Sequence, residues 1–160
     1  VLPRHKNFRS LSGLKILIVA AVWAGTTVIL PVISVLDTIS WNIKVETVQR
    51  FLFVLILLIP FEIRDLKYDS LLLKTLPQRV GVKGAKIIGY VWIALFYGAS
   101  FLKTELDINR MLAMTMVCSI LILVIYMTKK EQGKYFSSFW VEAIPLFWWL
   151  LFVFVERLVI

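Results

Sequence analysis

The sequence contains one cysteine, Cys118, and one histidine, His5, among its 160 residues. A single cysteine cannot form an intrachain disulfide, so a disulfide-stapled fold is excluded. His5 stands alone in a basic amino-terminal tail, and we interpret it as facing solvent or lipid rather than binding a ligand. The sequence also lacks an internal repeat, a low-complexity tail and a flexible linker, which indicates a single domain over residues 1–160.

Charged residues are scarce. They make up 18% of the sequence, whereas 60% of the residues are hydrophobic and the mean hydropathy is +0.86. A soluble domain of this length cannot enclose so much apolar surface, so a lipid bilayer is the natural solvent. The net charge of +8 occurs in short basic clusters between apolar runs. This arrangement favours anionic lipid headgroups or an anionic substrate as partners over nucleic acid.

Five stretches approach the roughly 20 apolar residues that a membrane-spanning helix needs. They cover residues 14–36, 48–61, 87–102, 111–127 and 139–159. The second and third are short as purely apolar runs, and we expect them to extend into their polar flanks. The predicted fold class is therefore all-α, a polytopic bundle with about five transmembrane helices.

The loops between these stretches carry unequal numbers of basic residues. When alternate loops are assigned to opposite sides, the 18 Lys and Arg residues divide into 13 and 5. The richer side holds Arg4, Lys6, Arg9, Lys15, Arg64, Lys67, Lys74, Arg79, Lys83, Lys86, Lys129, Lys130 and Lys134, and the other holds Lys44, Arg50, Lys103, Arg110 and Arg157. Because basic loops are retained in the cytoplasm, we expect the amino terminus to be cytoplasmic.

Three carboxylates lie at and beyond the end of the second apolar stretch. Glu62, Asp65 and Asp69 are spaced i, i+3 and i+7, which places them on one stripe if the segment is helical. Such oxygen ligands suit Mg²⁺, which is commonly held by one or two carboxylates together with substrate phosphates. The alternative is a solvated helix end whose charge is balanced by Arg64 and Lys67. The spacing leaves both interpretations open.

The wider pattern around these carboxylates is more specific. Glu62-Ile-Arg-Asp65-Leu-Lys-Tyr-Asp69 is followed by Lys74-Thr75-Leu76-Pro77-Gln78-Arg79-Val80-Gly81. This pattern resembles the second aspartate-rich motif of the UbiA superfamily of intramembrane prenyltransferases, in which an Asp-x-x-Asp-x-x-x-Asp run is followed by a Lys, a Thr-Leu-Pro and an Arg-x-Gly. The resemblance covers the end of one predicted helix and the basic loop after it.

The resemblance implies Mg²⁺-dependent transfer of a polyprenyl group from its diphosphate to a lipophilic acceptor, with no residue assigned as a catalytic acid, base or nucleophile. The residues that it assigns to Mg²⁺ and the bound diphosphate are Glu62, Asp65 and Asp69. Those that it assigns to the phosphate oxygens are Lys74, Arg79 and, more weakly, Lys67. It also implies a multi-pass protein of the bacterial inner membrane with the motif loop on the cytoplasmic side. Clustered cations stabilise the charge that develops on such a leaving group.

Two features differ from the family pattern. Glu62 stands where the family usually has aspartate, and the family's first aspartate-rich motif does not occur in the sequence. The five stretches correspond to the carboxyl-terminal half of the family's bundle, and the sequence opens at Val1 without a methionine. We therefore expect the missing half to come from a longer chain or from another membrane subunit. The alternative function is a non-catalytic membrane subunit or scaffold with a UbiA-like fold.

Two further residues carry open interpretations. Glu142 lies near the start of the last stretch, where it either faces a polar cavity or has a structural role. Trp148 follows in the same stretch, and such residues usually form an interfacial belt or pack in the bilayer rather than line a prenyl tunnel.

Overall fold

The computed structural model describes residues 12–35, 38–68, 75–105, 107–132 and 136–157, and in these ranges it contains helices and turns but no strand. The all-α prediction is therefore confirmed. In chain order the elements are α1 (Ser12–Ala24), the π-helical turn η2 (Gly25–Ile29), α2 (Leu30–Ile33), α3 (Trp41–Asp65), α4 (Leu76–Gly98), the 3-10 turn η4 (Ala99–Leu102), α5 (Ile108–Met127), the π-helical turn η5 (Phe136–Val141) and α6 (Glu142–Arg157).

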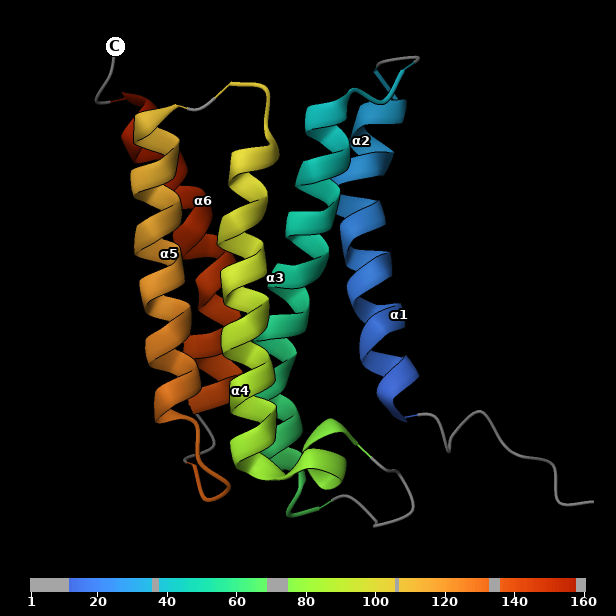
Figure 1. Cartoon of the computed structure of the whole chain (residues 1–160), viewed down its shortest axis with the longest axis vertical. Coiled ribbons are helices and arrows are strands. Elements are labelled where there is room, and N and C mark those ends of the chain that lie inside the picture. Colours follow the sequence, from blue (N-terminus) through green and yellow to red (C-terminus); the bar gives the residue numbers. More distant parts are fainter. Residues whose placement is uncertain (1–11, 36–37, 69–74, 106, 133–135, 158–160) are drawn as a thin grey trace, which may run out of the picture.

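These elements form five rods that run alternately up and down (Figure 1). The first rod combines α1, η2 and α2, the third combines α4 with η4, and the fifth combines η5 with α6, while α3 and α5 are rods by themselves. Short connections between consecutive helices favour this antiparallel arrangement. Among the described residues, the five predicted helices are thus all present.

Three of the rods have the length and composition of membrane spans. They cover Leu14–Ile33, Leu76–Leu102 and Ile108–Met127, and a shorter apolar helix covers Phe139–Phe154. Large apolar side chains such as Ile18, Val22 and Leu123 are more than 50% exposed on these rods, as expected for surfaces that face lipid. The chain is therefore an integral membrane protein.

The second rod is longer than its apolar run. Helix α3 spans 25 residues, enough to cross a bilayer, and it begins at Trp41 rather than near residue 48. Its polar first half is held by the third rod, because Gln49 is fully buried and donates hydrogen bonds to the Phe96 carbonyl (3.2 Å) and Ser100 Oγ (2.9 Å). The expected extension of the second and third stretches into their polar flanks is confirmed.

The core lies where α3, α4, α5 and α6 meet. Phe53, Phe96 and Trp148 pack against one another there in tilted and edge-to-face arrangements, with ring centroids 4.6 to 5.8 Å apart. Trp148 is only 8% exposed, so it packs inside the bundle and not in an interfacial belt. Gly89 of α4 lies beside Ile59 of α3 and Ile125 of α5, and their Cδ1 atoms occupy the space that a Cβ at this position would need.

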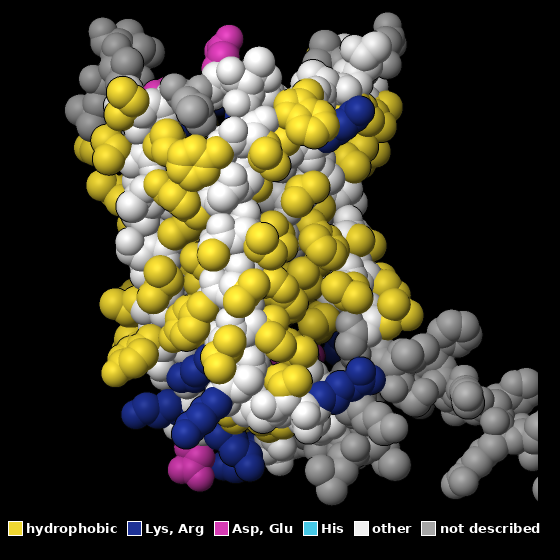
Figure 2. Space-filling view, viewed as in Figure 1, with side chains coloured by type: hydrophobic (Ala, Val, Ile, Leu, Met, Phe, Trp, Pro, Cys, Tyr) yellow, Lys and Arg dark blue, Asp and Glu magenta, His cyan; other side chains and the backbone are white. Residues whose placement is uncertain are grey.

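The two ends of the bundle differ in charge. Figure 2 shows hydrophobic side chains over the middle of this face and most of its Lys and Arg side chains at the end where α3 ends and α4 begins. We call this the basic end, and its described basic residues are Lys15, Arg64, Lys67, Arg79, Lys83, Lys86, Lys129 and Lys130. The opposite end carries Glu46 and Lys103, which form an ion pair that joins α3 to the turn after η4.

Candidate functional site

The predicted carboxylate stripe begins at the last turn of α3. Glu62 and Asp65 lie one helical turn apart, but α3 ends at Asp65 and a turn follows over residues 66–68. Helical spacing therefore connects these two carboxylates only, and Asp69 lies outside the described residues. The Asp65 Oδ1 accepts a hydrogen bond of 2.8 Å from Arg64 Nε, and the Arg64 guanidinium also lies 5.3 Å from the centre of the Phe61 ring.

The start of α4 explains several residue types in the motif. Thr75 is the N-cap residue, and its backbone N–H donates to Gln78 Oε1 at 3.2 Å, while Pro77 occupies the first turn, where no N–H is needed. Gly81 has φ 74° and ψ 169°, a conformation essentially restricted to glycine, and it kinks α4 after Val80. The short first segment of α4 lies across the basic end (Figure 1).

The basic residues assigned to phosphate oxygens are only partly described. Lys67 is exposed in the turn after α3, and Arg79 is exposed in the first segment of α4. Both lie at the basic end, on the two sides of the loop that contains Lys74, which itself lies outside the described residues. Sequence reasoning thus predicted two cations that the fold brings to the same end of the bundle as Glu62 and Asp65.

Two of the three carboxylates predicted to hold Mg²⁺, Glu62 and Asp65, lie within the described residues. The described residues contain no group of three potential metal ligands, but one or two carboxylates suffice when phosphate oxygens and water complete the shell. The ion pair of Asp65 with Arg64 engages Oδ1 and leaves Oδ2 outside the pair. Since the two side chains are 28% and 41% exposed, the pair contributes about 0–1 kcal/mol, and a ligand can displace it at low cost.

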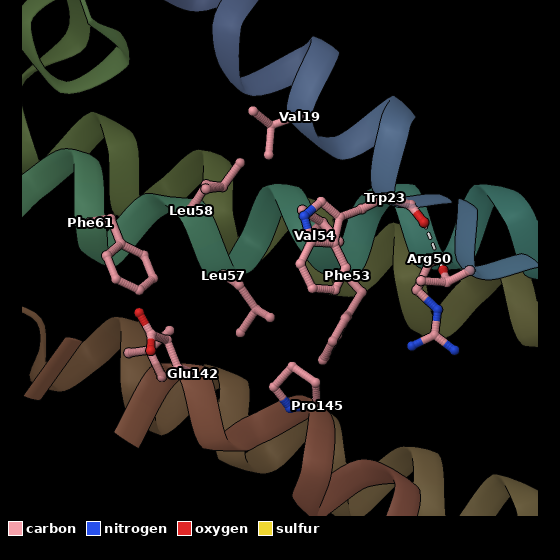
Figure 3. A pocket seen from close by; sticks show the side chains of 12 residues that line it. Val19, Trp23, Arg50, Phe53, Val54, Leu57, Leu58, Phe61, Glu142 and Pro145 are labelled. Carbon is pink, nitrogen blue, oxygen red and sulfur yellow. Dashed lines mark hydrogen bonds between the residues drawn. The ribbon is translucent and has the colours of Figure 1, made fainter. Parts of the chain in front are cut away.

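An apolar cleft opens beside these residues. Its volume is about 430 Å³, within the range of small-molecule sites, and it lies between α1, α3 and the fifth rod. The walls include Val19 and Trp23 of α1, Phe53 and Leu57 of α3, and Pro145 of α6 (Figure 3). Both π-helical turns border it, η2 through Thr27 and η5 through Val141. Such turns occur frequently at functional sites.

The two ends of the cleft carry opposite charges. Phe61 and Glu142 lie at one end, and Arg50 lies at the other (Figure 3). Phe61 directly precedes Glu62, so this end of the cleft adjoins the motif at the basic end. Glu142 is exposed and faces a largely apolar cleft, rather than the polar cavity that the sequence suggested.

Arg50 is the residue that sequence reasoning misplaced. The charge count grouped it with the loop residues, but it lies within α3, about 13 Å along the helix from Trp41. Its guanidinium carbon lies 4.4 Å from the centre of the Trp148 ring. The sequence does contain a signal for Arg50, because this basic residue lies two positions inside the predicted stretch 48–61. Ionisable residues at membrane depth commonly have a function.

In comparisons with protein-family models, curated proteins and solved structures, nothing matches this chain. The geometry of the basic end and of the cleft therefore carries the functional argument.

Proposed function

We propose that this chain is a UbiA-like intramembrane prenyltransferase, or the carboxyl-terminal half of one, which transfers a polyprenyl group from its diphosphate to a lipophilic acceptor with Mg²⁺. The observation that carries the proposal is the junction at Phe61. The apolar cleft ends at this residue, and the next residues of α3 include the carboxylates Glu62 and Asp65. An apolar chain and an anionic headgroup therefore have adjacent binding surfaces.

Each group of residues has a role in this proposal. The cleft holds the prenyl chain and keeps water from it, while Arg79 and Lys67, with Lys74, bind the phosphate oxygens. Glu62 and Asp65, with Asp69, would hold Mg²⁺, which would supply positive charge to stabilise the diphosphate as a leaving group. The basic end faces the cytoplasm of a bacterial inner membrane in this proposal, because positive loops are retained there.

A second function has its own support. Thr75, Pro77 and Gly81 each have a local role in forming the start of α4, and Asp65 is paired with Arg64. These residues can therefore be explained by folding alone. In this alternative the chain is a non-catalytic membrane subunit, and its exposed apolar faces serve assembly with another subunit.

Equilibrium binding of geranylgeranyl diphosphate to the chain in lipid nanodiscs distinguishes the two functions. With Mg²⁺ present, Arg79→Gln and Lys67→Gln are each expected to weaken binding by about tenfold, because a hydrogen bond to a charged group is lost. Lys44→Gln removes an exposed cation from the first half of α3 and serves as the matched control. If the first two variants bind as tightly as the wild type, the prenyl diphosphate assignment is wrong and the scaffold function is favoured.

A further inference from the structure

Arg50 has donors without a hydrogen-bond partner among the described residues. Glu46 lies one helical turn before Arg50 on α3, and its carboxylate forms an ion pair with Lys103. Arg50 makes no hydrogen bond or ion pair with any described residue, and its Nε is buried. Glu105, Asp107 and Arg110 line the same pocket as Glu46, Lys103 and Trp148, so Arg50 is distinguished by its unpaired donors and not by the total charge of the region. Unpaired donors of a guanidinium at membrane depth are costly, so this position favours a ligand that accepts hydrogen bonds.

The orientation of Arg50 suits anion binding. The guanidinium carbon lies 4.4 Å from the centre of the Trp148 ring, which holds the group by a cation–π contact. This contact uses no hydrogen-bond acceptor, so it leaves the N–H donors of the guanidinium without one. Arg50 also lines the apolar cleft, which gives an amphiphile a route to these donors (Figure 3).

We propose that the cleft binds a single-chain amphiphile with a carboxylate headgroup, such as a long-chain fatty acid, with the carboxylate on Arg50 and the chain directed toward Phe61. A carboxylate carries one negative charge, which matches the single positive charge of Arg50, and its two oxygens match the guanidinium fork. A phosphate dianion would instead leave an excess negative charge in an apolar environment.

The shape and polarity of the cleft fix the orientation of the amphiphile. Arg50 and Phe61 are separated by about 16 Å along α3, which accommodates an extended chain of roughly a dozen carbons with bonds of about 1.5 Å. The wall between them is formed by apolar residues, including Phe53, Val54 and Leu57. The cleft lining near Phe61 carries Glu142 and no cation, so a carboxylate without a bound metal ion is placed more favourably at Arg50 than in the reversed orientation.

This site does not depend on the proposed prenyl transfer. It uses Arg50 and Trp148, which lie away from the motif at the basic end. The two ligands do share the apolar volume of the cleft, so a bound fatty acid excludes a prenyl chain that enters beside Phe61. A carboxylate amphiphile would then inhibit prenyl diphosphate binding competitively if both proposals hold.

Binding in a bilayer depends mainly on the headgroup, because a hydrocarbon tail gains little when it moves from lipid into an apolar cleft. The direct experiment compares palmitate with hexadecanol, which has the same chain length but no charge. Both are added to the whole chain in nanodiscs of zwitterionic lipid, at a pH well above the ordinary carboxyl pKa so that palmitate is ionised. Native mass spectrometry then counts the bound molecules.

Three variants complete the experiment. Arg50→Gln removes the charge, Leu57→Trp fills the cleft and leaves Arg50 in place, and Lys44→Gln removes an exposed cation outside the cleft lining. We expect wild-type protein to bind palmitate at least about tenfold more tightly than hexadecanol. We expect both cleft variants to lose about tenfold in palmitate affinity and Lys44→Gln to lose none.

The proposal has clear contrary results. Equal binding of palmitate and hexadecanol by the wild type would overturn it, because Arg50 would then contribute nothing to binding of the carboxylate. Wild-type palmitate affinity in Leu57→Trp would also overturn it, even if Arg50→Gln does not fold. Failure of geranylgeranyl diphosphate to bind would count against the proposed function alone and would leave the fatty acid site intact.

Discussion

The Nε of Arg64 donates a hydrogen bond of 2.8 Å to Oδ1 of Asp65, its neighbour in the chain. This pair lies at the last turn of α3, one residue step from the turn that leads toward the motif loop. Because both side chains are partly exposed, the pair adds little to the stability of the fold. The Asp65 carboxylate is thus oriented at the basic end by Arg64, and the fold depends little on this contact.

The five-rod arrangement predicts that the loops after α4 and after α5 lie on opposite sides of the membrane. Single cysteines at Glu105 and Lys130, in a Cys118→Ala background, place one label in each of these loops. In sealed vesicles an impermeant maleimide should label only one of the two from outside. The positive-inside rule further predicts that position 130 is labelled from the cytoplasmic side. Labelling of both positions from the same side would refute the five-span topology.

Gly89 is expected to be intolerant of a side chain. A Cβ at this position would lie 2.5 Å from Ile125 Cδ1 and 2.8 Å from Ile59 Cδ1, so in Gly89→Ala either these two side chains or α4 itself must shift. We expect a loss of about 1–3 kcal/mol in the free energy of unfolding, measured by denaturant titration in detergent. Gly98→Ala is the matched control, because no atom lies within 4 Å of a Cβ there. Equal stability of the two variants would contradict the close packing.

Gly81 should be sensitive for a different reason. A Cβ at Gly81 would meet no atom within 4 Å, but its φ of 74° with ψ of 169° is unfavourable for any residue with a side chain. Gly81→Ala is therefore expected to cost about 1–3 kcal/mol or to straighten the kink. Hydrogen exchange in residues 76–80 distinguishes these outcomes, since straightening should change protection there and leave α5 unaffected. Unchanged stability and exchange would show that the kink does not need glycine.

The positions of the helices could be predicted from the sequence because membrane spans require long apolar runs. The fourth stretch, residues 111–127, matches α5 (Ile108–Met127) closely, since the run is uninterrupted and Asp107 caps it by accepting a hydrogen bond from Asn109 N. The second predicted stretch, residues 48–61, was shorter than α3 because the first half of this helix is polar. That half is helical through contacts with Ser100 and Lys103, which lie far away in the sequence.

The candidate site was predicted only in part, for a related reason. The described residues of the motif are close in sequence, so their common place at the basic end followed from the helix ends alone. The cleft is formed by residues from three separate rods, such as Val19, Leu57 and Pro145, and no local pattern relates them. The role of Arg50 likewise depends on Trp148, which is distant in the chain and which the sequence suggested would lie at the membrane interface or against lipid.

The most direct test of the central claim is the Mg²⁺ dependence of geranylgeranyl diphosphate binding to the wild-type chain and to Asp65→Asn in nanodiscs. If the carboxylates at the basic end hold Mg²⁺ with the diphosphate, Mg²⁺ should strengthen wild-type binding by about tenfold or more over binding in a chelator, and Asp65→Asn should remove most of this gain. Glu131→Gln, an exposed carboxylate in the next loop at the same end, should retain it. Equal affinity with Mg²⁺ and with the chelator in the wild-type chain would contradict the account.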